Sequence, residues 1–368
     1  MSTELMHAGE SRGNKSSLIY IIISASLFGI SLPLAKLLVN NIAPVVLAGL
    51  LYLGAFAGLS LYSLVKKIRT IDLAKKAVSL ERKDFPWLAG AVLTGGIIGP
   101  ISMMIGLTFI SGLSASLLLN LEGIATAMIA VFFFKENAGK RLWLALVSMT
   151  LAGIFLTWDS SQGKFNITGP LLIIFAMICW GIDNNLTRNI SDKDPIQIAK
   201  IKGFAAGIIS LLLALILGMK IPLDLTVAFA LLLGSFSYGI SLVFFIKALE
   251  GLGSSRTGAF FSFAPFIGAI ASLIILREWI EWVMLPATVL MIIGVWLIVT
   301  ERHSHIHIHR TKTHTHSHNH SDMHQHEHYR KFHEAHIHEH THLELSHVHV
   351  HWPDTQHRHE HETIIEVQ

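Results

Sequence analysis

Cysteine and charged residues are scarce in this chain. Of its 368 residues one is cysteine and 14% are charged, whereas 52% are hydrophobic, and the mean hydropathy is +0.53. The single cysteine, Cys179, excludes an intrachain disulfide. Because a soluble globular protein has about 25% charged residues, the composition predicts that the body of the protein, about residues 18–300, lies in a lipid bilayer.

Motifs for nucleotide binding and for common catalytic sites are also missing. We find no glycine-rich phosphate loop, no dinucleotide fingerprint and no catalytic-triad spacing. We therefore expect no enzyme activity, no direct use of ATP and no nucleic-acid partner. The pattern His338-Glu339-x-x-His342 matches that of zinc proteases. A chance match is expected in a segment so rich in histidine.

Ten apolar segments follow a polar N-terminal segment, residues 1–17. Short loops between several of them predict antiparallel neighbours. The first half (18–158) and the second half (169–300) contain five segments each, and residues 301–368 form a tail. We therefore predict an all-α integral membrane protein with ten transmembrane helices. Their expected bounds are 18–39, 43–65, 86–109, 113–134, 142–158, 169–190, 196–218, 225–249, 258–276 and 283–300.

Lysine and arginine are distributed unequally between the two sets of loops. If the N-terminus lies inside, the inner segments carry a large excess of basic residues, half of them between Lys66 and Lys83, and the outer loops carry only Lys164, Lys220 and Arg277. Basic residues favour the cytoplasmic side of a membrane. The sequence therefore predicts a multi-pass protein of the plasma or inner membrane with both termini in the cytoplasm.

The two halves resemble each other. Residues 26–36, SLFGISLPLAK, align with residues 178–188, ICWGIDNNLTR, which pairs Gly29 with Gly181. Five helices per half is an odd number, so the second half must enter the membrane in the opposite orientation. We therefore predict an inverted repeat, an arrangement that commonly places a substrate site near the membrane midplane.

The fourth segment contains a carboxylate. Residues 112–136 are expected to form one apolar helix with Glu122 near its middle, and a related stretch recurs about 142 residues later, at 257–278. Placing this charge at a helix centre costs up to roughly 3 kcal/mol, so Glu122 must have a polar partner, a water-filled cavity or a proton. It is either a structural partner of Asn120 or Lys247, or a pathway residue that binds a proton or a cationic substrate.

Other polar and aromatic residues are candidates for the same pathway. The sixth segment contains Asp183, Asn184 and Asn185, of which at most two can face one cavity because successive residues of a helix are about 100° apart. Lys36 either lines the pathway or extends its amine to the membrane surface. The full set of predicted pathway residues is Glu122, Asp183, Asn184, Asn185, Asn120, Lys36, Trp180 and Tyr238.

The fourth segment, which reads LLLNLEG and closes with FKE, together with ten segments in two halves, resembles the EamA-domain branch of the drug/metabolite transporter superfamily. The resemblance covers about residues 18–300 and implies a ten-helix secondary transporter. Members often have an L-E-P pattern in the fourth and ninth segments. Here Gly123 replaces the first proline and Ala264 replaces the second acid, so a symmetric site with two acids is not expected.

The tail has an unusual composition. Between His303 and His361, 22 of 59 residues are histidine, most of them alternating as H-x-H. We expect this segment to be disordered without metal and to bind divalent transition metal, zinc, nickel, cobalt or copper. The alternative is a tail that becomes cationic in mild acid. The expected ligands are His303, His305, His307, His309, His314, His316, His318, His320, His324, His326, His328, His336, His338, His340, His342, His347, His349 and His351.

Three functions are compatible with these features. The first is a secondary transporter that moves a small solute by alternating access, with a metal-binding tail and no cofactor for transport itself. The second is a transition-metal transporter proper. The third is a membrane-anchored metal sensor or buffer without transport. The sequence does not name the solute, and a homodimer is one option for the oligomeric state.

Overall fold

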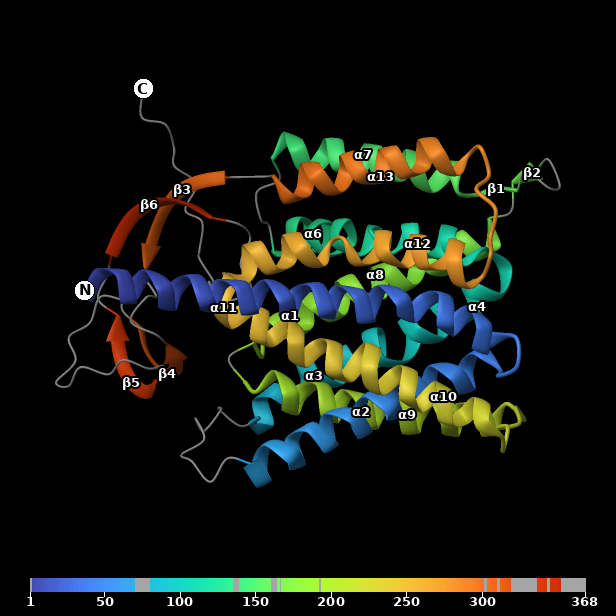
Figure 1. Cartoon of the computed structure of the whole chain (residues 1–368), viewed down its shortest axis with the longest axis horizontal. Coiled ribbons are helices and arrows are strands. Elements are labelled where there is room, and N and C mark those ends of the chain that lie inside the picture. Colours follow the sequence, from blue (N-terminus) through green and yellow to red (C-terminus); the bar gives the residue numbers. More distant parts are fainter. Residues whose placement is uncertain are drawn as a thin grey trace.

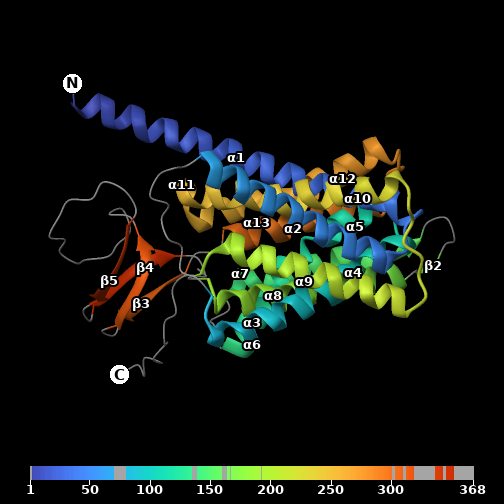
Figure 2. The same cartoon turned by 90° about the horizontal axis from the view of Figure 1, so that it is seen from below.

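The computed structural model describes residues 2–69, 80–134, 139–159, 164–165, 167–191 and 193–300, and four segments of the tail. The helices of the body run side by side along one direction (Figure 1). The last turn of α13 lies at the same end of the bundle as the beginning of α1, whose first turns extend beyond the other helices (Figure 2). The described ends of the body therefore lie on one side.

The first half contains five helical segments, two of them interrupted. The polar residues expected to form a separate N-terminal segment are part of the first helix. The elements are α1 (Ser2–Val39), α2 (Pro44–Arg69), the 3₁₀ turn η1 (Arg82–Asp84), α3 (Phe85–Ala91), the π-helix η2 (Val92–Ile98), α4 (Gly99–Phe109), α5 (Gly112–Leu118), α6 (Leu121–Phe134) and α7 (Lys140–Phe155).

The second half follows the same plan. A two-stranded antiparallel hairpin, β1 (Trp158–Asp159) and β2 (Lys164–Phe165), connects it to the first half. Its helices are α8 (Thr168–Arg188), α9 (Pro195–Ile216), α10 (Leu225–Gly234), the π-helix η3 (Ser235–Ile240), α11 (Ser241–Phe261), α12 (Ala264–Ile275) and α13 (Met284–Val299).

Eight helical segments of the described chain are long and apolar enough to cross a membrane. These correspond to eight of the ten predicted spans, so the chain is a multi-pass membrane protein. The predicted fifth and tenth spans are the shorter helices α7 and α13, of 16 residues each, which lie side by side (Figure 1). At about 1.5 Å per residue each is about 24 Å long, less than the ~30 Å hydrocarbon core. The count of ten is therefore not confirmed by helix length.

The fourth span, 112–136, is not the single helix that we expected. It is broken into α5 and α6, because the backbone N–H groups of Leu119, Asn120 and Glu122 donate to carbonyls three residues earlier instead of four. The side-chain amide of Asn120 also donates to the carbonyl of Leu117, at 3.0 Å. The break places Glu122 in the first turn of α6, where the helix dipole favours a negative charge.

The interruptions recur at equivalent positions in the two halves. The π-helices begin at Val92 and Ser235, which are 143 residues apart, and the breaks that follow α5 and α11 begin at Leu119 and Ser262, also 143 apart. This spacing agrees with the repeat seen in the sequence. The halves therefore share the local irregularities of their helices as well as their order.

The paired glycines also have equivalent neighbours. A Cβ atom on Gly29 of α1 would overlap the carbonyl oxygen of Ala264 in α12, and one on Gly181 of α8 would lie 2.9 Å from the backbone nitrogen of Thr126 in α6. Each glycine lets the first helix of one half contact the fourth segment of the other half. Small residues allow such close approach of membrane helices.

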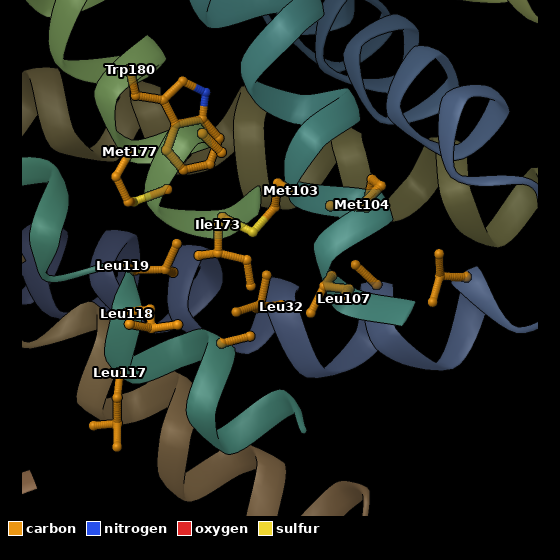
Figure 3. Packing of buried hydrophobic residues seen from close by; sticks show 14 of the residues in the cluster. Leu32, Met103, Met104, Leu107, Leu117, Leu118, Leu119, Ile173, Met177 and Trp180 are labelled. Carbon is orange, nitrogen blue, oxygen red and sulfur yellow. The ribbon is translucent and has the colours of Figure 1, made fainter. Parts of the chain in front are cut away.

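The centre of the bundle is apolar. Met103, Met104 and Leu107 of α4 pack with Leu118 of α5 and Ile173 of α8 (Figure 3), and each is at most 1% exposed. Large apolar side chains also cover the outside of the bundle, as Phe133, Ile216 and Trp279 show. A soluble protein rarely exposes so much contiguous apolar surface, and here the acyl chains of a bilayer would cover it.

Four segments of the tail are strands, so the predicted disorder of the tail is not confirmed for them. They are β3 (His303–His309), β4 (Lys312–His318), β5 (His336–His342) and β6 (Leu345–His351). β3 pairs with β6 and β4 with β5, both antiparallel. Alternation of histidine with valine, isoleucine, threonine and serine has the period of a strand. The predicted ligands His320, His324, His326 and His328 lie outside the described residues.

Candidate functional site

The half-buried carboxylate of Glu122 contacts the sixth span. Its Oε1 accepts a hydrogen bond from the side-chain amide of Asn184 in α8, at 2.9 Å. The same amide donates to the hydroxyl of Thr126, one turn after Glu122, at 3.1 Å. Asn120 and Lys247, the structural partners that we considered, are engaged elsewhere: Asn120 with the carbonyl of Leu117 and Lys247 with the ring of Tyr20.

A partly buried ion pair lies next to this contact. Asp183, which is 6% exposed, pairs through Oδ2 with the amine of Lys202 in α9 and accepts a hydrogen bond from the hydroxyl of Thr187, at 3.1 Å. Glu122 lies within electrostatic range of both Asp183 and Lys202. In the described part of the chain, Lys202 pairs with Asp183 and Glu122 itself has no ion pair.

Lys202 is the functional candidate that we missed. Its signal in the sequence is a lysine seven residues into the apolar helix Pro195–Ile216, about 10 Å from the helix start at ~1.5 Å per residue. The preference of basic residues for the cytoplasmic side of a membrane explains a lysine at a helix end, but it does not explain a lysine at this depth. A partly buried lysine inside the bundle is stabilised by a carboxylate in a neighbouring helix, and Asp183 supplies it.

The π-helix of the third span supplies a backbone acceptor. The carbonyl of Gly95 accepts from the hydroxyl of Tyr52, at 2.5 Å, and from the indole nitrogen of Trp180, at 3.1 Å. A π-turn disturbs the regular ladder of helix hydrogen bonds and is often found at functional sites. A Cβ atom on Gly95 would overlap Asp183, so this position has no room for a side chain.

Aromatic rings extend the site to the eighth span. The ring of Tyr238, in the π-helix of the eighth span, lies 6.0 Å from that of Tyr52 and 5.9 Å from that of Phe28. Tyr52 therefore connects Tyr238 to Gly95 and Trp180. The structure brings six of the eight predicted pathway residues to this region or its edge: Glu122, Asn120, Asp183, Asn184, Trp180 and Tyr238.

The remaining two candidates have structural contacts. The amide of Asn185 donates to the carbonyls of Thr126, at 3.1 Å, and Gly181, at 2.8 Å, and so joins α8 to α6. The amine of Lys36 donates to the carbonyls of Leu107 and Ile110, at the end of α4. This position favours a cation because of the helix dipole. Neither residue has a hydrogen bond or ion pair with Glu122 among the described contacts.

A second carboxylate closes the end of the bundle near Lys36. Glu278 accepts from the backbone N–H groups of Gly112, at 2.6 Å, and Leu113, at 2.8 Å, and so caps the N-terminus of α5. The preceding residue, Arg277, has a φ of 53°, a conformation that is uncommon for residues other than glycine. The second half therefore reaches across to the first half at this end.

The opposite end is also joined between the halves. The buried amine of Lys193 lies 3.1 Å from Glu81 and 3.5 Å from Asp84. Lys83 also pairs with Glu81, at 2.9 Å, and together the two lysines lower the pKa of the Glu81 carboxyl, the hydrogen bond from Lys83 contributing most. Both ends of the bundle thus have polar contacts between halves, on either side of Glu122.

Comparison with known families decides the identity of this arrangement. The model of the EamA-like transporter family matches the chain twice, over residues 15–158 and 167–300. The chain belongs to the EamA-like transporter family. The two matches coincide with the two halves of the fold, and the predicted resemblance is confirmed.

Proteins similar to this EamA-like chain are also described as transporters. An "uncharacterized transporter" of Methanothermobacter thermautotrophicus is 28% identical over 298 residues, which cover 76% of this chain and 85% of the relative. The "uncharacterized transporter YyaM" of Bacillus subtilis is 26% identical over 275 residues, 69% and 85% of the two chains. A solved structure with 17% identity and a TM-score of 0.54 covers 77% of this chain and 97% of its own, which supports the fold.

Proposed function

We propose that this protein is a secondary transporter that moves a small cationic or protonated solute by alternating access between its two halves. The observation that carries the proposal is the environment of Glu122. Its carboxylate is held by an amide and, through that amide, a hydroxyl, and lies about 15 Å from the start of α5, counting ~1.5 Å per residue. A carboxylate at such a depth is costly unless it meets water, a cation or a proton.

The accessibility of this contact supports a pathway. Glu122 is half-buried and Asn184 is exposed. Exposure of these two groups to lipid would cost more than exposure to water. We infer that they line a water-accessible cavity between α6 and α8. The neighbouring pair of Asp183 and Lys202 is neutral overall, so the site attracts a positive charge to Glu122.

The inter-half contacts at the two ends suggest how access alternates. The contacts to be broken in turn are that of Glu278 with the N-terminus of α5 and that of Lys193 with Glu81 and Asp84.

We propose ten crossings, including the short α7 and α13, in two inverted halves, with both termini in the cytoplasm. Cysteine labelling in a Cys179→Ser background tests this: Ser111→Cys should react from outside and Lys140→Cys from inside, and the reverse result contradicts the topology.

The function is tested most directly by neutralising Glu122. Glu122→Gln retains the shape and the hydrogen bond to Asn184 but removes the charge, so we expect insertion and folding to persist while transport is lost. Cells that lack the gene should be supplied with wild type, Glu122→Gln or the control Gly123→Ala, and their metal and metabolite contents compared under metal stress. The solute is the one that changes with wild type and the control but not with Glu122→Gln. If Glu122→Gln behaves like wild type for every solute, the carboxylate is structural.

We propose that the tail serves this transport by binding divalent transition metal, zinc, nickel, cobalt or copper. Protons compete with metal for imidazole nitrogens, so affinity should fall as the pH drops through about 6.5. Removing the residues after Arg302 should leave the helices inserted and change only the dependence on metal. Zinc titration of the full chain at pH 7.5 and 5.5 tests this. Equal binding at both values contradicts ligation by histidine.

A transition-metal transporter proper is the second candidate, and the tail is the feature that favours it. Against it, residues 16–300 contain no histidine and one cysteine, whereas soft metal ions prefer imidazole and thiolate ligands. The oxygen and amide groups around Glu122 suit an organic cation or a proton better. A metal sensor or buffer without transport would not need polar groups inside the bundle. In the cellular test, a change in metal content alone that Glu122→Gln abolishes would favour the metal transporter.

A further inference from the structure

The four strands of the tail share one register. His303 of β3 pairs with His351 of β6, and His318 of β4 pairs with His336 of β5. The two residue numbers add up to 654 in both cases, as they do in every other pair of the two ladders. The two sheets therefore have the register of one antiparallel hairpin, with β3 and β4 as one arm and β5 and β6 as the other.

In this register histidine lies opposite histidine. Six of the pairs join two histidines, whereas the alternate positions join residues typical of strands, such as Ile306 with Val348 and Thr313 with Thr341. Because side chains alternate between the faces of a strand, the histidine positions of each two-stranded segment share one face. The six pairs are His303–His351, His305–His349, His307–His347, His314–His340, His316–His338 and His318–His336.

We propose that these cross-strand histidine pairs are the metal-binding units of the tail, so that each divalent transition ion bridges the two arms of the hairpin. Residues directly opposite each other in an antiparallel pair have Cβ atoms about 4.5–5.5 Å apart. Alternate residues of one strand are about 6.8 Å apart along it. Metal–nitrogen bonds are about 2.0–2.1 Å long. The shorter cross-strand spacing therefore suits two imidazoles on one ion better than H-x-H within a strand. The inference rests on the proposed metal binding by the tail.

Bridging couples metal binding to the folding of the hairpin. A two-stranded hairpin is at best marginally stable in water, and an ion that binds only the paired form shifts the equilibrium towards it. Zinc should therefore order the tail, and a chelator should reverse this. Two adjacent pairs on one face can supply the four ligands of a tetrahedral zinc site.

Two sets of variants of the full-length protein, matched in the number of histidines, distinguish bridging from binding along one strand. One set breaks pairs: changing His305, His307, His314 and His316 to Asn leaves two complete pairs and retains every histidine of β5 and β6. The other set removes whole pairs: changing His305, His349, His314 and His340 to Asn leaves four complete pairs.

Zinc bound per chain at pH 7.5 is the measurement. Relative to wild type, we expect the variant with two complete pairs to lose about twice as many zinc ions per chain as the variant with four complete pairs. Histidines elsewhere in the tail contribute equally to both variants. If the variant with two pairs binds as much zinc or more, the strands bind metal individually and the inference is wrong. If wild type binds no zinc, the proposed metal binding itself fails.

The register can be measured independently with spin labels in a Cys179→Ser background. Labels at Ser304→Cys and Val350→Cys, which are opposite in the register, should give a short distance. The distribution of this distance should become narrower with zinc and broader with a chelator. The control pairs Ser304→Cys with Ser346→Cys, four residues along β6. Its distance should be longer by about 9 Å, because a shift of ~13.6 Å along the strand, at ~3.4 Å per residue, adds at right angles to a cross-strand spacing of about 5 Å. A zinc-bound control pair that is the shorter of the two, or distances that zinc does not change, overturns the bridging arrangement.

Discussion

The broken fourth and ninth spans are equivalent in fold and differ in chemistry. In both, a helix ends (α5 or α11), two residues turn, and a second helix begins. At the fourth-span break Glu122 is half-buried and bonded to Asn184. At the ninth-span break Ala264 is completely buried against Gly29, and Pro265 occupies the first turn of α12, where proline is tolerated because its missing N–H would have no helical partner.

This difference distinguishes the features that both halves retain from the features that only the proposed transport site requires. Both halves keep the break and the close contact that a glycine allows, although only one carries a charge at that point. The ion pair of Asp183 and Lys202 also lies wholly within the second half. The polar site is therefore asymmetric, and the break in the ninth span is apolar. The following predictions test this division, from the largest expected change in stability to the smallest.

The largest loss of stability should follow from breaking the ion pair between Asp183 and Lys202. Lys202→Met leaves Asp183 buried without its counter-charge, which typically costs about 3–5 kcal/mol. We expect a large drop in the thermal stability of the detergent-solubilised protein. The double variant Asp183→Asn with Lys202→Met should recover most of it, because neither charge remains. Equal loss in the single and double variants would show that Lys202 acts through packing alone.

Introducing a carboxylate at the apolar break of the ninth span should lower the stability by slightly less. Ala264→Glu places a carboxylate beside the backbone of α1 with no amide partner there, so we expect a loss of roughly 2.5–3.5 kcal/mol, the cost of a charge at the centre of a membrane helix. Combining it with Glu122→Gln should not restore transport. Restored transport would mean that either break can hold the charge and that the asymmetry is incidental.

The smallest effect should come from the shared glycine contact. Gly29→Ala forces a methyl group against the carbonyl of Ala264, and overpacking of this kind costs about 1–3 kcal/mol. Gly123→Ala is the matched control, because no atom lies within 4 Å of the added methyl group and alanine favours a helix by up to about 1 kcal/mol. Thermal unfolding should therefore shift in opposite directions. A Gly29→Ala variant as stable as wild type contradicts the close contact.

The sequence was sufficient for the family, for the membrane class and for most span boundaries, because apolar runs and a repeat of about 142 residues are strong signals. It also selected Glu122 and the polar residues of α8 as candidates, and their role stays a prediction. It did not reveal the break at Leu119, since leucine and asparagine occur in continuous membrane helices as well. Lys202 was missed because a lysine near a helix start resembles a surface residue until its depth and its partner are known.

The pairing of the histidine strands was hidden for another reason. Alternation of histidine with β-branched residues has the period of a strand, but it fixes neither the partner nor the register, both of which depend on residues tens of positions away. A sequence so rich in histidine also offers several registers in which some histidines are opposite each other. The strand pairs remove this ambiguity.

The two π-helices bear on the history of the chain. A π-turn closes its hydrogen bonds over five residues instead of four, so it accommodates an extra residue in a helix of otherwise constant phase. Val92–Ile98 and Ser235–Ile240 hold this extra residue at matching places in the third and eighth spans. One insertion in an ancestral half, followed by duplication of that half, accounts for both. The wide turn of the π-helix is therefore older than the duplication, whereas the charged groups differ between the two halves.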